Sequence, residues 1–200
     1  MIAALVPAAG LSARMGRPKL LLDVHGQPLI QRVIRALKNG GADRVLVIAP
    51  PIHQEGSIRI QELAADAGAE TTHLVAPTVD MRSTIEAGLL LVTGEFEPPS
   101  GVLIAPGDSV GMTSGLVAAV VRQFLTDPSR IIVPEREGRR GHPLALPWTV
   151  AMAIRNLPRN VGVNALLSAP EARVDRLLVA FPDLDADLDT PEDYRRWSGA

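Results

Sequence analysis

Short apolar runs recur along the first two-thirds of the chain, and each is followed by turn residues and then by a stretch with helical spacing. Runs of this kind are typical of strands that are buried on both faces. The predicted strands are residues 2–8, 44–49, 72–75, 102–105 and 131–133. The predicted helices between them are residues 29–39, 58–67, 83–91 and 115–125. This alternation favours a three-layer α/β fold with a mostly parallel sheet.

The alternation loosens after residue 133. Residues 135–141 are charged and glycine-rich and read as an insertion or flap, and the predicted elements that follow are a strand at 143–146, a helix near 150–156 and a strand at 174–181. Thr190 and Pro191 are typical of an N-cap and the first position of a last helix. We expect one domain at 1–197, with a distinct subregion at about 135–170 and a tail at 198–200.

The amino-acid composition restricts the classes of function and the partners that the chain can have. The 200 residues suit a single domain, and the absence of cysteine excludes disulfides, thiol nucleophiles and cysteine-bound metals. Twenty Lys and Arg against 22 Asp and Glu give a net charge of -2 with no long basic run, so no nucleic-acid partner is expected. The first ten residues suit neither a signal peptide nor a membrane span, so no membrane partner and a cytoplasmic location are expected.

The loop after the first predicted strand carries phosphate-binding chemistry. Small residues at Ala8, Ala9 and Gly10 let the backbone turn sharply and approach a ligand. Successive amide groups in such a turn form an array of donors for phosphate, and Arg14 and Lys19 add cations that reach the same oxygens. Neither the Walker spacing nor the dinucleotide fingerprint is present. The alternative is a plain strand-to-helix turn, which occurs in any α/β domain.

Acidic residues occur where a divalent cation is expected. Asp108 follows a buried run and Pro106-Gly107, at the carboxyl end of a predicted parallel strand, where ligand sites of open α/β sheets lie. Much later, residues 183–190 contain four aspartates. Asp108 and one of these late acids can hold Mg²⁺ against a triphosphate. Helix capping by Asp108 and a solvated acidic turn are the structural alternative.

Residues 8–21 read Ala-Ala-Gly-x-Ser-x-Arg-Met-Gly-x-Pro-Lys-Leu-Leu and resemble the signature loop of the MobA-like NTP transferases. Ala9 favours the molybdenum cofactor cytidylyltransferase branch over the guanylyltransferase branch. The resemblance extends over residues 7–194 and implies a Rossmann-like nucleotidyltransferase fold in which Arg14, Lys19 and Asp108 are catalytic. The implied nucleotide-binding residues are Ala8, Ala9, Gly10, Ser12, Arg14, Lys19, Ser83 and Asp108.

Two further motifs of the family concern the metal. Gly107-Asp108 and residues 187–193, Asp-Leu-Asp-Thr-Pro-Glu-Asp, match its metal-binding elements and imply Mg²⁺ on Asp108 with Asp187 or Asp189. The family usually has a proline two residues after the first aspartate. Val110 stands there in this chain, so a residue that would stiffen the loop is lost.

Residues 78–89 resemble a family stretch in which a helix N-terminus faces the nucleotide, and Ser83 or Thr84 is expected to contact the base or ribose. A plain N-cap is the alternative role for Ser83. Residues 138–143 resemble the Gly-x-x-Gly-His-Pro element that faces the acceptor substrate, so the subregion at 135–170 is expected to face it too. The implied acceptor-binding residues are Arg140, His142 and Asn164; a structural histidine and a solvated charged loop are the alternatives.

The sequence thus predicts a Mg²⁺-dependent enzyme that transfers CMP from CTP to molybdopterin-type molybdenum cofactor and releases pyrophosphate. One alternative is transfer to a sugar 1-phosphate or another small phosphate. Another is a non-catalytic nucleotide-binding or cofactor-binding accessory protein that docks on a molybdoenzyme. An NAD(P)-dependent oxidoreductase ranks last because the dinucleotide fingerprint is missing.

Overall fold

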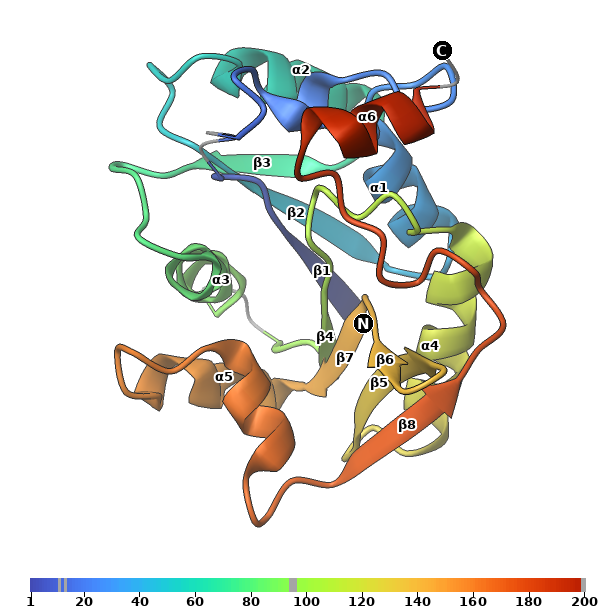
Figure 1. Ribbon diagram of the computed structural model, residues 1–200. Coiled ribbons are helices and arrows are strands. Elements are labelled where there is room, and N and C mark those ends of the chain that lie inside the picture. The colour runs from blue at the N-terminus through green and yellow to red at the C-terminus, as the bar shows by residue number, and fades with distance from the viewer. Residues whose placement is uncertain (11, 13, 94–96, 199–200) are drawn as a thin grey trace.

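The computed structural model describes the chain except for residues 11, 13, 94–96 and 199–200. The last two positions of the expected tail at 198–200 therefore lie outside the described residues. The described strands form one eight-stranded sheet in the order β3-β2-β1-β4-β7-β5-β6, with β8 paired to β5. Helices cover both faces of this sheet, so the protein has the predicted three layers (Figure 1).

Two groups of strands make up the sheet. The parallel strands are β3 (Glu70–His73), β2 (Arg44–Ala49), β1 (Ile2–Pro7) and β4 (Gly101–Ile104). The remaining strands are β7 (Leu144–Pro147), β5 (Ile131–Arg136), β6 (Arg139–Arg140) and β8 (Val174–Leu178). Strand β7 is antiparallel to both β4 and β5, whereas β8 runs parallel to β5. The sheet is therefore mostly parallel, with two antiparallel members.

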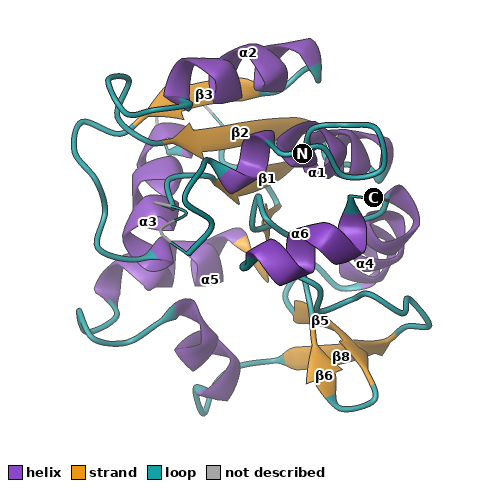
Figure 2. Ribbon diagram, turned by 45° about the horizontal axis from the view of Figure 1, so that its top comes forward, coloured by secondary structure: helices purple, strands orange, loops and turns teal. Residues whose placement is uncertain are grey.

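The helices divide between the two faces. One face carries α1 (Leu29–Asn39), α2 (Ser57–Asp66) and α4 (Ser114–Thr126), with α6 (Pro191–Trp197) on the same side (Figure 2). The other face carries α3 (Met81–Val92) and α5 (Trp148–Ala153). The described residues also contain three 3₁₀ turns: η1 (Lys19–Leu21), η2 (Ile154–Asn156) and η3 (Val163–Ser168). No helix among the described residues is both long and apolar enough to cross a membrane.

Two hydrophobic cores lie on opposite faces of the sheet. Every residue of β1 is buried, with Val6 in the core under α1 and α4 and Leu5 in the core under α3 and α5. This burial on both faces explains why the strand runs lack an alternating pattern. Leu5, Ile48 and Leu89 are completely buried in the second core.

The predicted elements are confirmed with three differences in the strands. Strand β3 is shifted toward its N-terminus, to Glu70–His73, because Val75 is 98% exposed and lies in the loop that follows. The strand predicted at 174–181 ends at Leu178. Residues 135–141, predicted as part of an insertion or flap, contain a hairpin: β5 continues to Arg136 and turns into β6 through Glu137 and Gly138, both with positive φ, as in a two-residue hairpin.

Candidate active site

The site forms where the carboxyl ends of β1 and β4 meet. These two strands are neighbours and parallel, but the chain leaves β1 toward β2 on one side and reaches β4 on the other. A crevice at such a switch point is the usual ligand site of an open α/β sheet. The loop at 8–19 follows β1, and the loop that contains Asp108 follows β4. The topology therefore brings both predicted motifs to one edge.

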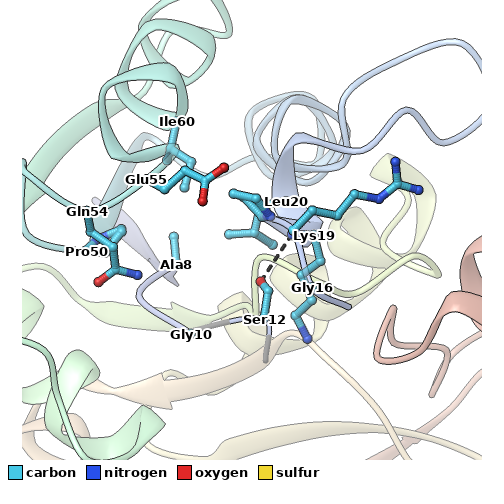
Figure 3. Close-up of a pocket in the computed structure, with 12 residues that line it drawn as sticks. Ala8, Gly10, Ser12, Gly16, Lys19, Leu20, Pro50, Gln54, Glu55 and Ile60 are labelled. Atoms are coloured by element: carbon cyan, nitrogen blue, oxygen red, sulfur yellow. Dashed lines mark hydrogen bonds between the residues drawn. The ribbon is translucent and has the colours of Figure 1, made fainter. Parts of the chain in front are cut away.

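The loop after β1 is braced by its own side chains. Ser12 has a φ of 50°, and its hydroxyl accepts a hydrogen bond from the backbone N–H of Lys19 at 3.1 Å (Figure 3). The amides of Met15 and Gly16 donate to the carbonyl of Ser12, and the side chain of Met15 is buried. Gly10 has no atom beyond its chain neighbours within 4 Å of where a Cβ would be, so its backbone faces open space. Gly10 thus exposes its backbone beside a turn that is held by hydrogen bonds to Ser12.

Lys19 connects the loop to two carboxylates. Its ammonium lies 2.5 Å from Oδ2 of Asp108 and 2.8 Å from Oδ1 of Asp189. Burial alone lowers the pKa of Lys19, but the charges and hydrogen bonds of the two aspartates outweigh it and raise the pKa above its ordinary value. Arg14, which is exposed, pairs with the other oxygen of Asp189 at 3.0 Å. Both predicted phosphate-binding cations therefore face the predicted metal-binding acids.

The late acidic segment is attached to the loop after β4 by backbone hydrogen bonds. The N–H of Leu188 donates to the carbonyl of Asp108 at 3.0 Å, and the N–H of Val110 donates to the carbonyl of Ala186 at 2.8 Å. A proline at position 110 would lack that donor. The departure from the family pattern at Val110 therefore replaces a stiff residue by a hydrogen bond that joins the two acidic segments.

Close packing holds the same segment from the other side. A Cβ built on Gly111 would lie 1.7 Å from the carbonyl oxygen of Asp183. Leu184 and Leu188 are buried, and Thr190 caps α6 in a capping box with Asp193, as predicted for the last helix. The acids between these anchors have little freedom to move away from Asp108.

Asp187 has an unfavourable electrostatic environment. Burial, and then the charges of Asp108 and Asp189, raise its pKa to about 6, although Lys19 and a hydrogen bond with Ser109 oppose the shift. Hydrogen bonding to Lys19 lowers the pKa of Asp189. Carboxylates that resist ionising together suit a divalent cation, which removes the repulsion.

A protein-only metal cage is not present in the described part of the chain. No group of three or more His, Asp or Glu side chains there is arranged to hold an ion. Mg²⁺ commonly uses one or two carboxylates and takes its other ligands from water and substrate phosphates. Asp108 with Asp187 or Asp189 would supply the two carboxylates of such a Mg²⁺ site.

Two cavities lie on either side of the loop after β1. One, of about 390 Å³, is lined at one end by Lys19, Asp108 and Asp189 and at the other by Asp80 and Thr84 of the α3 N-terminus. The other, of about 300 Å³, lies between the loop and the N-terminus of α2 (Figure 3). Ala8, Gly10, Ser12 and Lys19 line both cavities, and Ala9 and Arg14 line the first. The first cavity combines the acids, the cations and a helix N-terminus.

The prediction for the α3 N-terminus needs a correction. Asp80, not Ser83, is the N-cap: its Oδ1 accepts from the N–H and the hydroxyl of Ser83, each at 2.7 Å. These bonds, the one to the hydroxyl first, lower the pKa of Asp80. Thr84, the alternative to Ser83, lines the first cavity and is buried. Ser83 as a nucleotide contact stays a prediction.

The three predicted acceptor residues lie on separate elements. Arg140 is exposed on β6, Asn164 is exposed on η3, and His142 lies between β6 and β7 before a cis peptide bond to Pro143. None of them lines either of the two cavities described above. Burial lowers the pKa of His142, which a hydrogen bond with the backbone of Ile104 and the charge of Asp108 oppose. The lowered pKa of His142 favours the neutral imidazole, and Asp108 is near enough to act on it.

Sequence reasoning missed Gln54 and Glu55, which line the second cavity from the loop after β2 (Figure 3). The signal was present: β2 is predicted as a buried parallel strand, and polar residues follow its carboxyl end. The pairing of β2 with β1 places that end at the same edge as the phosphate loop.

A switch-point crevice in which a phosphate-type loop faces paired acids defines a nucleotidyltransferase of the Rossmann-like type. Residues 4–176 match the MobA-like NTP transferase domain, and the chain belongs to this family.

Two curated relatives align with nearly all and with half of the chain. The molybdenum cofactor guanylyltransferase of Rhodobacter capsulatus is 28% identical over 204 residues, which cover 98% of this chain and 94% of that protein. The 2-C-methyl-D-erythritol 4-phosphate cytidylyltransferase of Saccharopolyspora erythraea is 35% identical over 116 residues, or 50% of this chain. The chain spans about half of that relative, 51% of its length.

Solved structures support the fold. Rv0371c of Mycobacterium tuberculosis H37Rv superposes with a TM-score of 0.82 at 22% identity and covers 100% of this chain and 99% of that one. A complex of the same protein with manganese gives a TM-score of 0.73 at 20% identity, covering 100% and 98%. A nucleotidyl transferase from Methanothermobacter gives a TM-score of 0.80 at 21% identity, covering 98% and 95%.

Proposed function

We propose that this nucleotidyltransferase uses Mg²⁺ to transfer CMP from CTP to molybdopterin-type molybdenum cofactor. The observation that carries the proposal is the ammonium of Lys19 between Asp108 and Asp189 at the switch point of the sheet. A triphosphate with a divalent cation is the ligand that complements both the cations and the acids of this site.

The chain's own cations hold the triphosphate. The amides of Ala9 and Gly10 would donate to phosphate oxygens, and Arg14 and Lys19 would supply charge-assisted hydrogen bonds. Because each cation is paired with a carboxylate, nucleotide binding would exchange an aspartate partner for a phosphate partner. The released carboxylates would hold a divalent cation, which would balance their charge.

Asp108 with Asp187 or Asp189 would hold Mg²⁺. When bound, the ion would neutralise negative charge that develops on the phosphates during transfer. The manganese complex of Rv0371c supports a divalent cation in this fold. The N–H groups of Val110 and Leu188 then serve to keep the two acidic segments together.

The transfer step is an in-line displacement. A phosphate oxygen of the acceptor forms a bond to the α-phosphorus of CTP, and the bond from that phosphorus to the bridging oxygen of the β-phosphate breaks, so pyrophosphate leaves. Lys19 and Arg14 stabilise the charge on the transferred and departing groups, and the hydrogen bond from the Lys19 N–H to Ser12 helps to position the lysine. The chain supplies positioning and electrostatics, not a covalent intermediate.

The acceptor is assigned to the side of the site formed by the subregion at about 135–170. Arg140 is exposed and suits an anionic group, Asn164 offers an amide, and the neutral His142 lies near Asp108. The relative from R. capsulatus, which spans nearly the whole chain, supports a molybdenum cofactor as acceptor. Ala9 and the cytidylyltransferase relative support CTP as donor.

Transfer to another small phosphate is the second candidate. The cytidylyltransferase from S. erythraea favours it, because its acceptor, by name, is a sugar-alcohol phosphate and it is 35% identical to half of this chain. The loop and the acids serve either reaction, so the acceptor side decides between them. Accessory binding without turnover, with or without a molybdoenzyme partner, is the remaining outcome.

Calorimetry and a pyrophosphate assay test these functions. We expect CTP to bind in the presence of Mg²⁺ more tightly than GTP, and pyrophosphate to appear only when molybdopterin-type cofactor is added. Release of pyrophosphate with a sugar phosphate but not with the cofactor would support the second candidate. Tight binding of CTP without turnover would identify an accessory protein, and no binding of any nucleoside triphosphate would refute the proposal.

A further inference from the structure

Arg82 is a buried cation next to the first cavity. The reaction described above does not use this side chain. It lies in the first turn of α3 and is 8% exposed. Its Nε donates to Glu86 Oε1 at 2.7 Å, one turn further along the helix. Because the guanidinium is paired and enclosed, its remaining donors are directed to specific acceptors.

Those acceptors are backbone carbonyls of a single distant loop. Arg82 donates to the carbonyls of Leu157 at 2.6 Å and of Val161 at 3.0 Å, and also to the carbonyl of Pro158. The loop has few backbone hydrogen bonds of its own: Leu157 N–H donates to Ile154 and Val161 N–H donates to Pro158. Its conformation therefore depends on the arginine that caps its carbonyls.

Arg82 joins this loop to the helix end that lines the active site. Helix α3 follows β3 and packs on β1 and β2, and its N-terminus lines the cavity that contains Lys19 and Asp108. Arg82 is part of that N-terminal turn, and its side chain binds the loop. Figure 1 shows α3 and α5, which precedes the loop, on one side of the sheet. The loop leads directly into η3, which carries Asn164.

We propose that Arg82 is a positioning residue that couples nucleotide binding at the α3 N-terminus to the segment 157–168. Met81 and Thr84 line the nucleotide cavity, and Arg82 lies between them in sequence with its side chain on the loop. A nucleotide that orders the first turn of α3 thereby orders the acceptor-facing segment. This inference rests on the proposed function, because it needs a nucleotide in the first cavity and an acceptor beside the segment.

Hydrogen exchange on the full chain, with and without CTP and Mg²⁺, tests the coupling. In the wild type, CTP is expected to slow exchange both in the first turn of α3 and in residues 157–168. In Arg82→Met, CTP affinity is expected to stay within about twofold, while slowing at 157–168 disappears and the KM for the acceptor rises about tenfold. Arg82→Lys, which keeps the charge with fewer donors, is expected to restore part of both effects.

Arg59→Met is the matched control, because Arg59 is an exposed helical arginine that pairs with Glu62 at 2.7 Å, and it is expected to behave as the wild type. Slowing at 157–168 in Arg82→Met, or an unchanged acceptor KM, would overturn the coupling. If the methionine variant does not fold, Arg82→Lys alone decides, since it must show a weaker exchange response than the wild type. Absence of CTP binding to the wild type would instead refute the proposed function.

Discussion

Lys19 Nζ lies 2.5 Å from Oδ2 of Asp108, so the cation predicted to bind phosphate and the acid predicted to bind metal form one ion pair. The two residues follow β1 and β4, which are adjacent parallel strands. Although burial opposes it, the charges and hydrogen bonds of Asp108 and Asp189 raise the pKa of Lys19. In the proposed function, a triphosphate would replace the carboxylate at Lys19 and a divalent cation would replace the lysine at Asp108.

Replacement of this lysine is expected to abolish most turnover. In Lys19→Ala, pyrophosphate release should fall by about 100-fold to 1000-fold, because a charge-assisted contact to the developing phosphate charge is lost. Thermal stabilisation by Mg²⁺ alone should persist, since the carboxylates remain. Lys38→Ala is the control: Lys38 is the other lysine of the chain, and its ammonium contacts the Gly68 carbonyl on the surface at 2.8 Å. Near-normal turnover of Lys19→Ala would contradict the site.

Asp187 is expected to make stability depend on pH in the absence of divalent cations. Its pKa is about 6 in the folded chain and 3.8 by its ordinary value, so the folded state binds the proton more tightly. The penalty for ionising Asp187 is absent below about pH 4, grows as the pH rises and is complete above about pH 6. Asp187 is exposed at the surface, so screening by solvent reduces the size of the effect.

Melting temperatures measured in EDTA test this dependence. The difference between Asp187→Asn and the wild type should be near zero at pH 4 and should favour the variant above pH 6. Mg²⁺ should raise the melting temperature of the wild type more than that of the variant at pH 8. A difference that does not change with pH would show that Asp187 titrates normally. Asp185→Asn, an exposed acid of the same segment, is the matched control.

Thr190 is expected to stabilise the C-terminal helix and the backbone of the metal-binding segment together. Its hydroxyl accepts from the N–H of Asp193, whose carboxylate accepts from the N–H of both Thr190 and Asp189. Thr190→Ala should cost about 1 kcal/mol of unfolding free energy, or roughly 2–4 °C in melting temperature. The Mg²⁺ concentration for half-maximal activity should rise, because Asp189 loses part of its support. Thr190→Ser, which keeps the cap, should restore both.

Gly111 is expected to tolerate no side chain. A Cβ there would lie 1.7 Å from the Asp183 carbonyl oxygen, so Gly111→Ala must displace the segment that carries Asp187 and Asp189. We expect a loss of about 1–3 kcal/mol in unfolding free energy and a weaker response to Mg²⁺. Gly162→Ala is the control, since a Cβ on Gly162 would meet nothing within 4 Å. Wild-type stability of Gly111→Ala would show that the segment moves freely.

Much of the fold was predictable from local patterns. Strands such as β1 and β2 are buried on both faces, and continuous apolar runs report that burial directly. The pattern failed at Val75, an apolar residue that is almost fully exposed, and at Glu137-Gly138, where two positive φ angles make a hairpin turn from a charged stretch. The presence of an apolar residue does not show whether another part of the protein packs against it. A charged residue can still belong to a strand at the edge of a sheet.

The sequence by itself determined the alternation of strands and helices, the loop at 8–19 with its two cations and the presence of acids near positions 108 and 187. These features depend on residue type and short spacing, which are visible along the chain. Only the tertiary structure decided that Lys19 forms an ion pair with Asp189, 170 positions away. The same holds for the hydrogen bond that the Val110 N–H makes where the family has a proline. It also holds for Arg82, which binds the carbonyls of a loop 75 to 79 residues distant. Such contacts depend on how strands are ordered and how loops pack, and no local pattern of residues encodes that arrangement.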